Sequence, residues 1–350
     1  MSRKPLVSFL MPVFNAERTV EPAVRSMLGQ RGLDASGIEY LVVDDGSTDS
    51  TFDLLNRLAA QDSRLRLIRL AHRGLVPALV EGQACCRGEF IARMDADDVA
   101  HPDRLATQLE LMRSDPRLGL VGTQVRYFPR NRVREGLLYY ESWLNSLLDG
   151  SDTLSVNQKI QREIFIECPL AHPTFLLRRE ALENTGGYRD CRNWPEDYDL
   201  VLRVVSAGWR LGGAARVLHL WREHGGRASR TDLRYSEESF RSLKIHFLLE
   251  TRLAGGRRPV SICGAGPVGK AWLKDLQAEG VTVRCLVEVN PRKIGKRIHG
   301  VPVVQAGKLK QLEDPGLILG AVGQKGARES VRASLDPLGF AEGEDYIFVA

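Results

Sequence analysis

The sequence lacks the closely spaced cysteine pairs that bind zinc. Its 350 residues include six cysteines, at positions 85, 86, 168, 191, 263 and 285, and none forms a C-x-x-C motif. No cluster of histidines accompanies them to complete a metal site. We therefore expect free thiols in a reducing compartment, which favours a cytoplasmic protein.

Long apolar runs are absent as well. The apolar stretch Leu6 to Phe14 follows Arg3 and Lys4, but it is far shorter than the roughly 20 residues of a membrane-spanning helix. No cleavage site of a signal peptide precedes the first expected strand. These features again favour a cytoplasmic location, and they leave open a peripheral contact with the inner face of the membrane.

Charge of one sign does not dominate the chain. Lysine and arginine number 49 against 44 for aspartate and glutamate, a formal net charge of +5. Nucleic-acid-binding proteins concentrate positive charge on one face, whereas here only two short basic clusters occur, Arg126 to Arg134 and Arg292 to Arg297. We expect no nucleic-acid partner. The clusters fit either a solvated surface or contacts with anionic phosphates or lipid.

The first half of the chain alternates apolar runs with amphipathic ones. Strands are expected at Leu6–Val13, Glu39–Val43, Leu65–Leu70 and Glu89–Met94, and helices at Glu17–Leu28, Thr51–Ala60, Val76–Cys86 and Pro102–Arg113. Strands and helices that alternate at this spacing predict an α/β protein with a mostly parallel sheet and helices on both faces.

The pattern breaks at residues 254–259, where glycines, arginines and a proline follow one another. A strand–helix–strand rhythm then restarts at Val260. Because one hydrophobic core rarely serves a chain of this length, we expect two domains. The sequence predicts a first domain over residues 1–232, a connecting amphipathic helix and linker over 233–256, and a second domain over 257–350.

The strongest chemical signal is an apolar strand that leads into three carboxylates, Phe90 to Asp98. On an extended chain Asp95 and Asp97 point to the same side, and like charges held so close imply a counter-cation. Carboxylate oxygens suit Mg²⁺ or Mn²⁺, which commonly bridge to substrate phosphates. The position at the carboxyl end of a parallel strand favours this interpretation over a solvated turn in which Asp98 caps the next helix.

Two further acidic groups carry chemical meaning. Asp44 and Asp45 end another expected strand, where carboxylates can accept bonds from a nucleotide base or ribose. Helix capping explains the Ser47–Asp49 segment that follows, but it does not explain the Asp44–Asp45 pair. Glu196 and Asp197 begin an expected helix, where acids are favoured by the helix dipole and where one of them can also serve as a general base.

Together with their surroundings these groups carry a resemblance over the first 230 or so residues. The matching segments are Val7–Asn15 with Glu17, Val43–Asp49, Phe90–Asp98, Pro102–Leu105, His172–Thr174, Gly186–Arg189, Glu196–Leu200 and Trp221–His224 with Ser229. In order and spacing they resemble family 2 of the inverting nucleotide-sugar glycosyltransferases, which have the GT-A fold.

The resemblance implies a role for each acidic group. Asp97, with Asp95, would hold Mn²⁺ or Mg²⁺, and Asp197 would be the catalytic base, with Glu196 beside it at the acceptor. The residues that would bind the nucleotide-sugar donor are Pro12, Asn15, Glu17, Asp44, Asp45, Arg73, Asp95, Asp97 and Arg222. One segment departs from the family pattern, because the usual Asn-x-Gly reads Ala71-His72-Arg73-Gly74 here.

The second expected domain begins with a glycine motif. Gly264, Gly266 and Gly269 form G-x-G-x-x-G directly after a strand, and Glu288 follows Gly266 by about twenty residues, as in a dinucleotide-binding fingerprint. The segment resembles the small Rossmann-like domains found on sugar-modifying enzymes. It is therefore a possible second nucleotide site, and a purely structural or docking role is the alternative.

These signals together predict an inverting glycosyltransferase. The donor would be an NDP-sugar, most readily a UDP-sugar, and the acceptor a hydroxyl of a saccharide or glycolipid in polysaccharide or glycolipid biosynthesis. Metal-assisted single displacement would invert the anomeric centre. A non-catalytic protein that binds nucleotide sugars or regulates is one alternative. An NAD-dependent oxidoreductase is another, although it leaves the first 250 residues unexplained.

Overall fold

The computed structural model describes residues 4–34, 37–190 and 194–350. The chain divides into two compact units. The first comprises Met1–Ile160 and Pro169–Asp232, and the second comprises Gln161–Cys168 and Leu233–Ala350.

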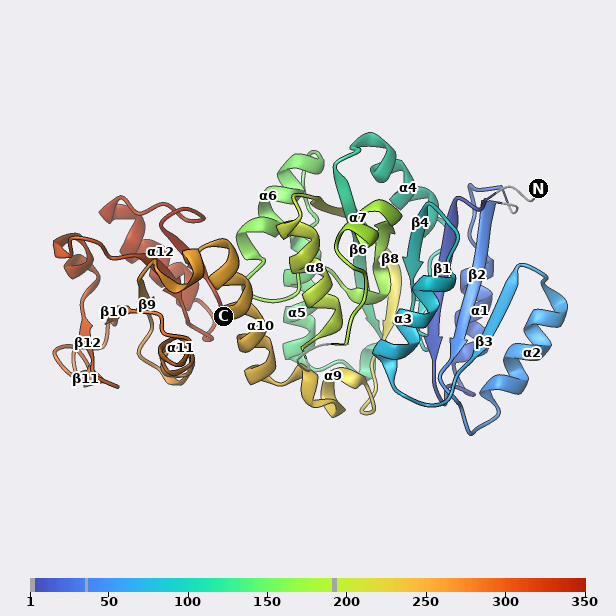
Figure 1. Ribbon diagram of the computed structural model, residues 1–350, viewed down its shortest axis with the longest axis horizontal. Coiled ribbons are helices and arrows are strands. Elements are labelled where there is room, and N and C mark those ends of the chain that lie inside the picture. Colours follow the sequence, from blue (N-terminus) through green and yellow to red (C-terminus); the bar gives the residue numbers. More distant parts are fainter. Residues whose placement is uncertain (1–3, 35–36, 191–193) are drawn as a thin grey trace. The chain divides into compact units, whose positions relative to one another are not determined.

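The first unit is built on a sheet in which eight strands of the described chain lie in the order β3-β2-β1-β4-β7-β6-β8-β5 (Figure 1). Their bounds are β1 Val7–Val13, β2 Ile38–Asp44, β3 Leu65–Arg69, β4 Phe90–Arg93, β5 Val99–Ala100, β6 Leu118–Phe128, β7 Leu176–Arg178 and β8 Arg210–Arg222. Strands β1 to β4 run parallel, as do β6 and β8, whereas β7 and β5 pair antiparallel with their neighbours. The predicted α/β fold with a mostly parallel sheet is confirmed.

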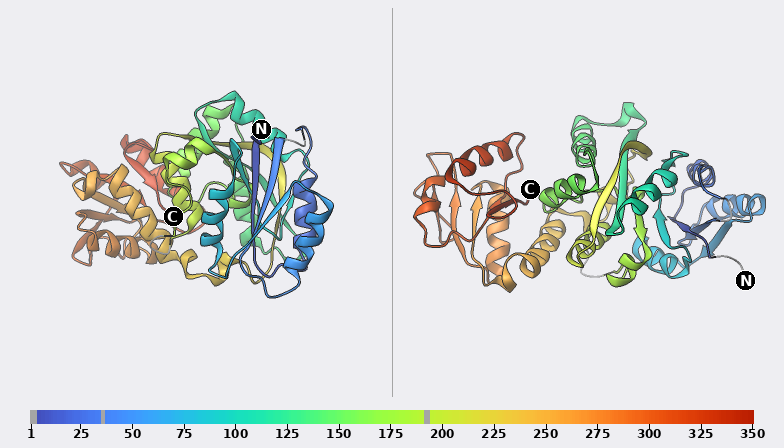
Figure 2. Two further views of the ribbon diagram at one scale, coloured as in Figure 1. Left: turned by 45° about the vertical axis from the view of Figure 1, so that its right-hand side comes forward. Right: turned by 90° about the horizontal axis from the view of Figure 1, so that it is seen from above.

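Helices cover both faces of this sheet (Figure 2). They are α1 Val20–Leu28, α2 Thr51–Gln61, α3 Leu75–Cys85, α4 Arg104–Ser114, α5 Glu135–Ser146, α6 Thr153–Glu163, α7 Arg179–Asn184, α8 Glu196–Ser206 and α9 Ala228–Thr231. Every residue of β1 and β2 is buried, which explains why these strands read as continuous apolar runs. Two of the polar residues among them, Ser8 and Glu39, hydrogen-bond to each other at 2.6 Å.

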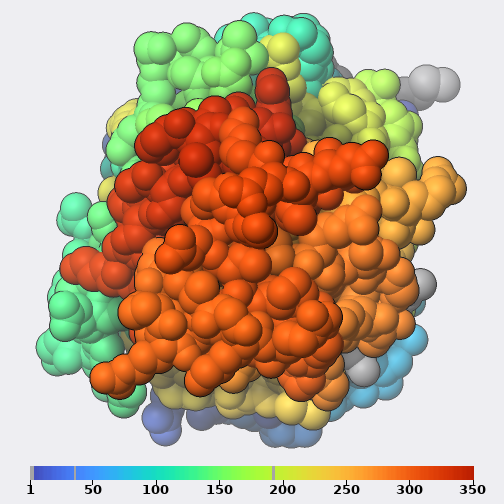
Figure 3. Space-filling model, turned by 90° about the vertical axis from the view of Figure 1, so that its left-hand side faces the viewer, coloured from blue at the N-terminus to red at the C-terminus, as the bar shows by residue number. Residues whose placement is uncertain are grey.

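The second unit contains a smaller sheet with the order β11-β12-β10-β9-β13-β14. Its elements are α10 Glu237–Thr251, β9 Val260–Cys263, α11 Pro267–Ala278, β10 Val283–Val287, β11 Arg297–Ile298, β12 Val301–Val304, β13 Leu317–Gly320, α12 Ala327–Leu335 and β14 Tyr346–Phe348. Only β11 runs antiparallel to its neighbour. The β11–β12 edge of this sheet, drawn in orange, faces the viewer in Figure 3.

Helix α10 begins four residues later than the sequence pattern predicts. Leu233–Tyr235 form a short 3₁₀ turn, and the helix starts after Ser236, whose side chain accepts a hydrogen bond from the backbone N–H of Ser239. The apolar periodicity gave no sign of this cap, which fixes the first turn by satisfying one of its free N–H groups.

Within the described ranges, no helix combines the length and the apolar character that crossing a bilayer requires. Five cysteines, Cys85, Cys86, Cys168, Cys263 and Cys285, are free thiols. Cys191 lies outside the described residues.

A buried lysine packs inside the second unit. Lys244 on α10 donates hydrogen bonds from Nζ to the carbonyl oxygens of Ile166, at 2.6 Å, and Val349, at 3.1 Å. Burial lowers the pKa of Lys244 to about 8, against the attraction of the nearby Glu167. The ammonium therefore destabilises the folded unit at neutral pH relative to an exposed lysine.

We expect Lys244 to make the free energy of unfolding rise with pH above about 8. An unfolded lysine titrates near 10.5, so between these values the unfolded chain binds more protons, and raising the pH favours the folded state. The variant Lys244→Met should lose this rise, which amounts to about 2 kcal/mol between pH values of about 8 and 10. Urea unfolding measures it, with the exposed Lys270→Met as control. An equal rise in Lys244→Met and in the wild type would contradict the assignment.

Candidate active site

The predicted site residues of the first unit gather at one edge of its sheet. Strands β2, β1 and β4 are parallel neighbours. Asp44 is the last residue of β2, Asn15 follows β1, and Asp95 follows β4. Carboxyl ends of adjacent parallel strands are where open α/β sheets bind ligands, so the folding of the chain brings these separate motifs together.

Asp44 and Asp45 are both buried, but their oxygens are used differently. Asp45 accepts hydrogen bonds from the backbone N–H of Arg73 (2.9 Å) and of Gly74 (2.7 Å), and its Oδ2 lies 2.8 Å from His72 Nδ1. Asp44 Oδ1 accepts from the Ser47 N–H, whereas Oδ2 is buried without a hydrogen bond. Asp45 therefore holds the 72–74 loop, whereas Asp44 has a buried acceptor oxygen that no donor of the described chain satisfies.

Arg69 approaches Oδ2 of Asp44, the carboxylate oxygen that has no hydrogen bond. Its Nε lies 3.4 Å from Asp44 Oδ2, so the two groups form an ion pair. Their relative orientation does not form a hydrogen bond. The Arg69 guanidinium also stacks on Phe52, 4.3 Å from the ring centre. Arg69 thus balances the charge of Asp44 while the lone pairs of Oδ2 stay unused.

Asn15 and Glu17 fasten the loop after β2 to the loop after β1. Asn15 has a positive φ of 47° and accepts a hydrogen bond from the Thr48 N–H at 2.9 Å. Glu17 accepts one from the Ser50 N–H at 3.2 Å. Pro12 is buried in β1, past Leu10, the last residue that pairs with β4, so its missing N–H leaves no gap in that ladder.

Arg73 lies in the loop that Asp45 holds. Its guanidinium is exposed and pairs with Glu81 at 3.2 Å. An exposed pair of this kind is weak, so the side chain is able to turn toward an anionic ligand at little cost.

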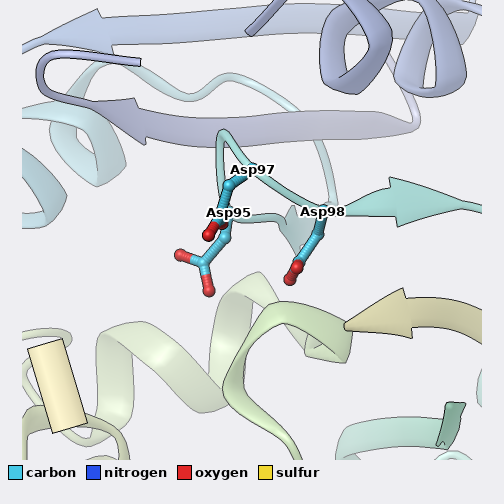
Figure 4. A group of neighbouring side chains, drawn as sticks. All are labelled: Asp95, Asp97 and Asp98. Carbon is cyan, nitrogen blue, oxygen red and sulfur yellow. The ribbon is translucent and has the colours of Figure 1, made fainter. Parts of the chain in front are cut away.

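The three carboxylates after β4 form one oxygen cluster. Asp95, Asp97 and Asp98 each offer an oxygen atom, and these atoms lie within 4.8 Å of one another. Figure 4 shows the carboxylates of Asp95 and Asp97 close together, with Asp98 to one side on the same loop. A set of hard oxygen donors at this spacing fits Mg²⁺ or Mn²⁺.

Asp95 is held by an arginine that the sequence analysis did not select. Arg93, the last residue of β4, is buried and places Nη2 2.6 Å from Asp95 Oδ1. Burial acts to raise the pKa of Asp95, but the charge and hydrogen bond of Arg93, together with the charges of His172 and Arg227, lower it below its usual value. The Nε and Nη1 atoms of Arg93 are buried without hydrogen bonds. The sequence does contain a signal for this ion pair, a single arginine in an apolar strand, because buried arginines are rarely unpaired.

Asp97 is paired with a histidine from the segment after β8. His224 Nε2 lies 2.8 Å from Asp97 Oδ2, and both side chains are partly exposed. Burial, together with the charges of Asp98 and Asp95, raises the pKa of Asp97 to about 6. This repulsion among like charges is what a bound cation would relieve.

Asp98 belongs to a buried network. Its Oδ2 lies 2.8 Å from His219 Nε2, and His219 in turn lies beside the buried Arg104. Its Oδ1 accepts from the Arg222 N–H at 2.7 Å. Burial raises the pKa of Asp98 and lowers that of His219. Asp98 thus joins its loop to β8, a tertiary role that the sequence pattern did not indicate.

Arg222 packs against the acidic loop. Its Nε donates to the backbone oxygen of Asp97 at 2.5 Å, and its guanidinium stacks 4.4 Å from the ring centre of Phe128. In this arrangement Arg222 supports the backbone that carries Asp97.

Glu196 and Asp197 begin α8, as the sequence predicts, but their environments differ. Glu196 is buried, and its Oε1 lies 3.5 Å from Nδ1 of His172, whose Nε2 lies 2.8 Å from the Tyr188 hydroxyl. Asp197 is less buried, and its Oδ1 accepts from the Tyr198 N–H at 2.7 Å. Asp197 is therefore the more accessible of the two acids.

The glycine motif lies in the second unit, around a cavity that also includes Glu288. Gly264 and Gly266 line this cavity, and Gly269 lies in the first turn of α11.

The mostly parallel α/β sheet of the first unit matches the GT-A fold. The family model for glycosyl transferase family 2 matches residues 8–186, more than half of the chain, so the protein belongs to this family. The family and the fold class predicted from the sequence are both confirmed.

Relatives differ in how much of their length the chain covers. It is 29% identical over 240 residues to EpsE of Bacillus subtilis (strain 168), whose name assigns it to the glycosyltransferases, covering 67% of this chain and 80% of EpsE. It is also 29% identical over 209 residues to a chondroitin synthase of Escherichia coli, covering 59% of this chain but only 28% of the synthase.

Two solved structures share the fold. S. aureus TarS 1–349 in complex with UDP-GlcNAc superposes with a TM-score of 0.53 at 17% identity, over 69% of this chain and 66% of that one. The mannosyltransferase PcManGT of Pyrobaculum calidifontis, in complex with GDP-Man and Mn²⁺, gives 0.50 at 19% identity, over 79% and 70%.

Proposed function

We propose that this glycosyltransferase moves a sugar from a nucleoside-diphosphate donor to an acceptor hydroxyl with the help of a divalent cation. The observation that carries the proposal is the cluster of Asp95, Asp97 and Asp98 oxygens at the end of β4. Two strands away in the sheet, β2 ends at Asp44, whose Oδ2 is buried without a hydrogen bond. One group suits a cation at a diphosphate, and the other suits a nucleoside.

The nucleoside would bind above β1 and β2. Asp44 Oδ2 is buried without a hydrogen bond, and a buried acceptor of this kind costs stability until a donor reaches it. A base N–H or a ribose hydroxyl supplies that donor. Asn15 and Glu17 keep the surrounding loops in place, and the exposed Arg73 is free to approach the diphosphate.

The cation would be held by Asp97 and Asp95, with His224 in reach as a further ligand. The observed donor set fits, because its oxygens cluster within 4.8 Å and His224 already lies against Asp97. When bound, Mn²⁺ or Mg²⁺ neutralises the negative charge that develops on the departing diphosphate. The Mn²⁺ in the PcManGT structure supports this assignment.

Asp197 would take the proton from the acceptor hydroxyl. Its carboxylate is more accessible than that of Glu196. Glu196 is buried and pairs with His172, a contact that suits it to hold the start of α8 in position. Attack by the acceptor on the face opposite the diphosphate inverts the anomeric centre in one displacement. The acceptor we propose is a saccharide or glycolipid in polysaccharide biosynthesis, which the chondroitin synthase similarity supports.

Titration calorimetry of UDP and GDP against the full chain, in Mn²⁺ and in EDTA, tests the proposal. We expect one of the two nucleotides to bind at least about tenfold more tightly with Mn²⁺, since several kcal/mol of charge stabilisation come from the cation. The absence of any UDP or GDP binding that depends on Mn²⁺, whatever binding persists in EDTA, would overturn the metal-assisted function.

A further inference from the structure

The second unit contains a cavity of about 730 Å³ that the transferase chemistry does not use. Three loops line it, residues 263–268 after β9, 287–289 after β10 and 321–327 after β13. Its volume falls in the range of small-molecule sites, about 300–1,000 Å³. All three loops leave the carboxyl ends of parallel strands.

The topology places this cavity where open α/β sheets bind ligands. Strand β9 lies in the centre, the chain then crosses to β10 on one side, and it later returns to β13 on the other. The strand order therefore reverses between β9 and β13. At such a reversal the two loops diverge and leave a crevice, and here the cavity occupies it.

Two glycines of the motif, Gly264 and Gly269, are tightly packed, whereas the third, Gly266, faces free space. Gly264 has a φ of 115°, and a Cβ there would lie 2.7 Å from the Ala321 oxygen; a Cβ on Gly269 would lie 1.9 Å from the Gly264 oxygen. By contrast, a Cβ on Gly266 would meet no atom within 4 Å. Gly264 and Gly269 are thus required by packing, whereas Gly266 leaves space at the cavity wall.

The lining has the character of a phosphate site. The first residues of α11 and of α12, which are 12 and 9 residues long, both border the cavity, and their N–H groups and dipoles attract anions. Lys293 and Lys325 also line it. Two helix ends and two lysines around one cavity suit more than a single negative charge.

Glu288 argues against ribose recognition of the fingerprint type, in NAD and in a mononucleotide alike, so the phosphate groups of a ligand carry its recognition here. In the dinucleotide fingerprint this acid binds the ribose hydroxyls, which requires free carboxylate oxygens. Here Oε1 accepts from the N–H groups of Val289 and Asn290, and Oε2 lies 2.9 Å from Lys293 Nζ. Lys293 also reaches the Ala265 oxygen at 3.3 Å, so it bridges the acid and the glycine loop where the ribose would lie.

We propose that this cavity binds the terminal diphosphate of a nucleoside diphosphate, independently of divalent metal, in preference to NAD, whose internal diphosphate carries less negative charge. The diphosphate lies at Gly266 and the first turn of α11, and Lys293 pairs with it. The site is separate from the transferase site, so its existence does not depend on the function proposed for the first unit.

Calorimetry of the full chain in EDTA, with UDP, GDP, ADP and NAD as probes, tests this site. At least one nucleoside diphosphate is expected to bind at least about tenfold more tightly than NAD, because two helix N-termini and Lys293 attract its negative charge. Gly266→Glu adds a carboxylate at the open position and should abolish this binding. Gly307→Glu adds the same charge where a Cβ is equally free but outside the cavity lining, and should leave binding unchanged.

Lys293→Gln gives a second readout if Gly266→Glu fails to fold. It frees Glu288 and removes a cation, so the preference for the diphosphate over NAD should fall at least about threefold. Three outcomes would overturn the proposal. They are the absence of diphosphate binding in EDTA, NAD binding as tight as that of any diphosphate, and binding that persists in folded Gly266→Glu.

Discussion

Replacing Asp97 with alanine is expected to lower donor turnover about a thousandfold and to remove the Mn²⁺-dependent part of nucleotide binding, since a bound cation contributes several kcal/mol. Asp97 lies between Asp95 and Asp98 in the oxygen cluster, and its other contact is His224 at 2.8 Å. Release of the nucleoside diphosphate from UDP- and GDP-sugars by slow hydrolysis measures turnover without a known acceptor.

Asp53→Ala is the matched control, because this aspartate is exposed in the first turn of α2 on the same unit. It should change neither turnover nor the effect of Mn²⁺. If Asp97→Ala retained Mn²⁺-dependent binding while Asp95→Ala lost it, the cation would be held by Asp95 without Asp97, which would contradict the role proposed for Asp97.

Asp197→Asn is expected to lower turnover by about 10²–10⁴, the usual contribution of a general base, while nucleotide affinity in Mn²⁺ stays within about twofold of the wild type. The amide keeps the size of the side chain and a carbonyl oxygen for the Tyr198 N–H, but it cannot take a proton. Single-turnover hydrolysis and calorimetry on the same sample separate the two effects.

Glu183→Gln serves as the control, since it makes the same change of acid to amide on an exposed side chain of α7. It should behave as the wild type in both measurements. A loss of nucleotide affinity in Asp197→Asn as large as its loss of turnover would show that Asp197 binds the donor and does not act as the base.

The fold followed from the sequence because periodicity records burial. Strands β1 and β2 are buried on both faces and read as unbroken apolar runs, and α1 shows the alternation of a helix with one buried side. Helix starts were less certain. The Ser236 cap depends on a single side-chain contact that periodicity does not contain.

The acidic residues of the site could be predicted from the sequence, but the contacts that distinguish one acid from the next could not. Asp44 and Asp45 are neighbours of the same type, yet one keeps an unused oxygen and the other is bonded to the 72–74 loop. What separates them is a loop about thirty residues away along the chain, which only the folded structure brings near. Arg93 and His219 were missed for the same reason, since their partners are set by the tertiary fold.

The loop that carries the three carboxylates is fastened on both sides of Asp97. Arg93 holds the Asp95 carboxylate, the Asp98 N–H donates to the backbone oxygen of Asp95, and His219 holds the Asp98 carboxylate. The loop therefore has few conformations to lose if the proposed cation and diphosphate bind to it. Most of their interaction energy then remains as affinity, because little is offset by the entropy of ordering the protein.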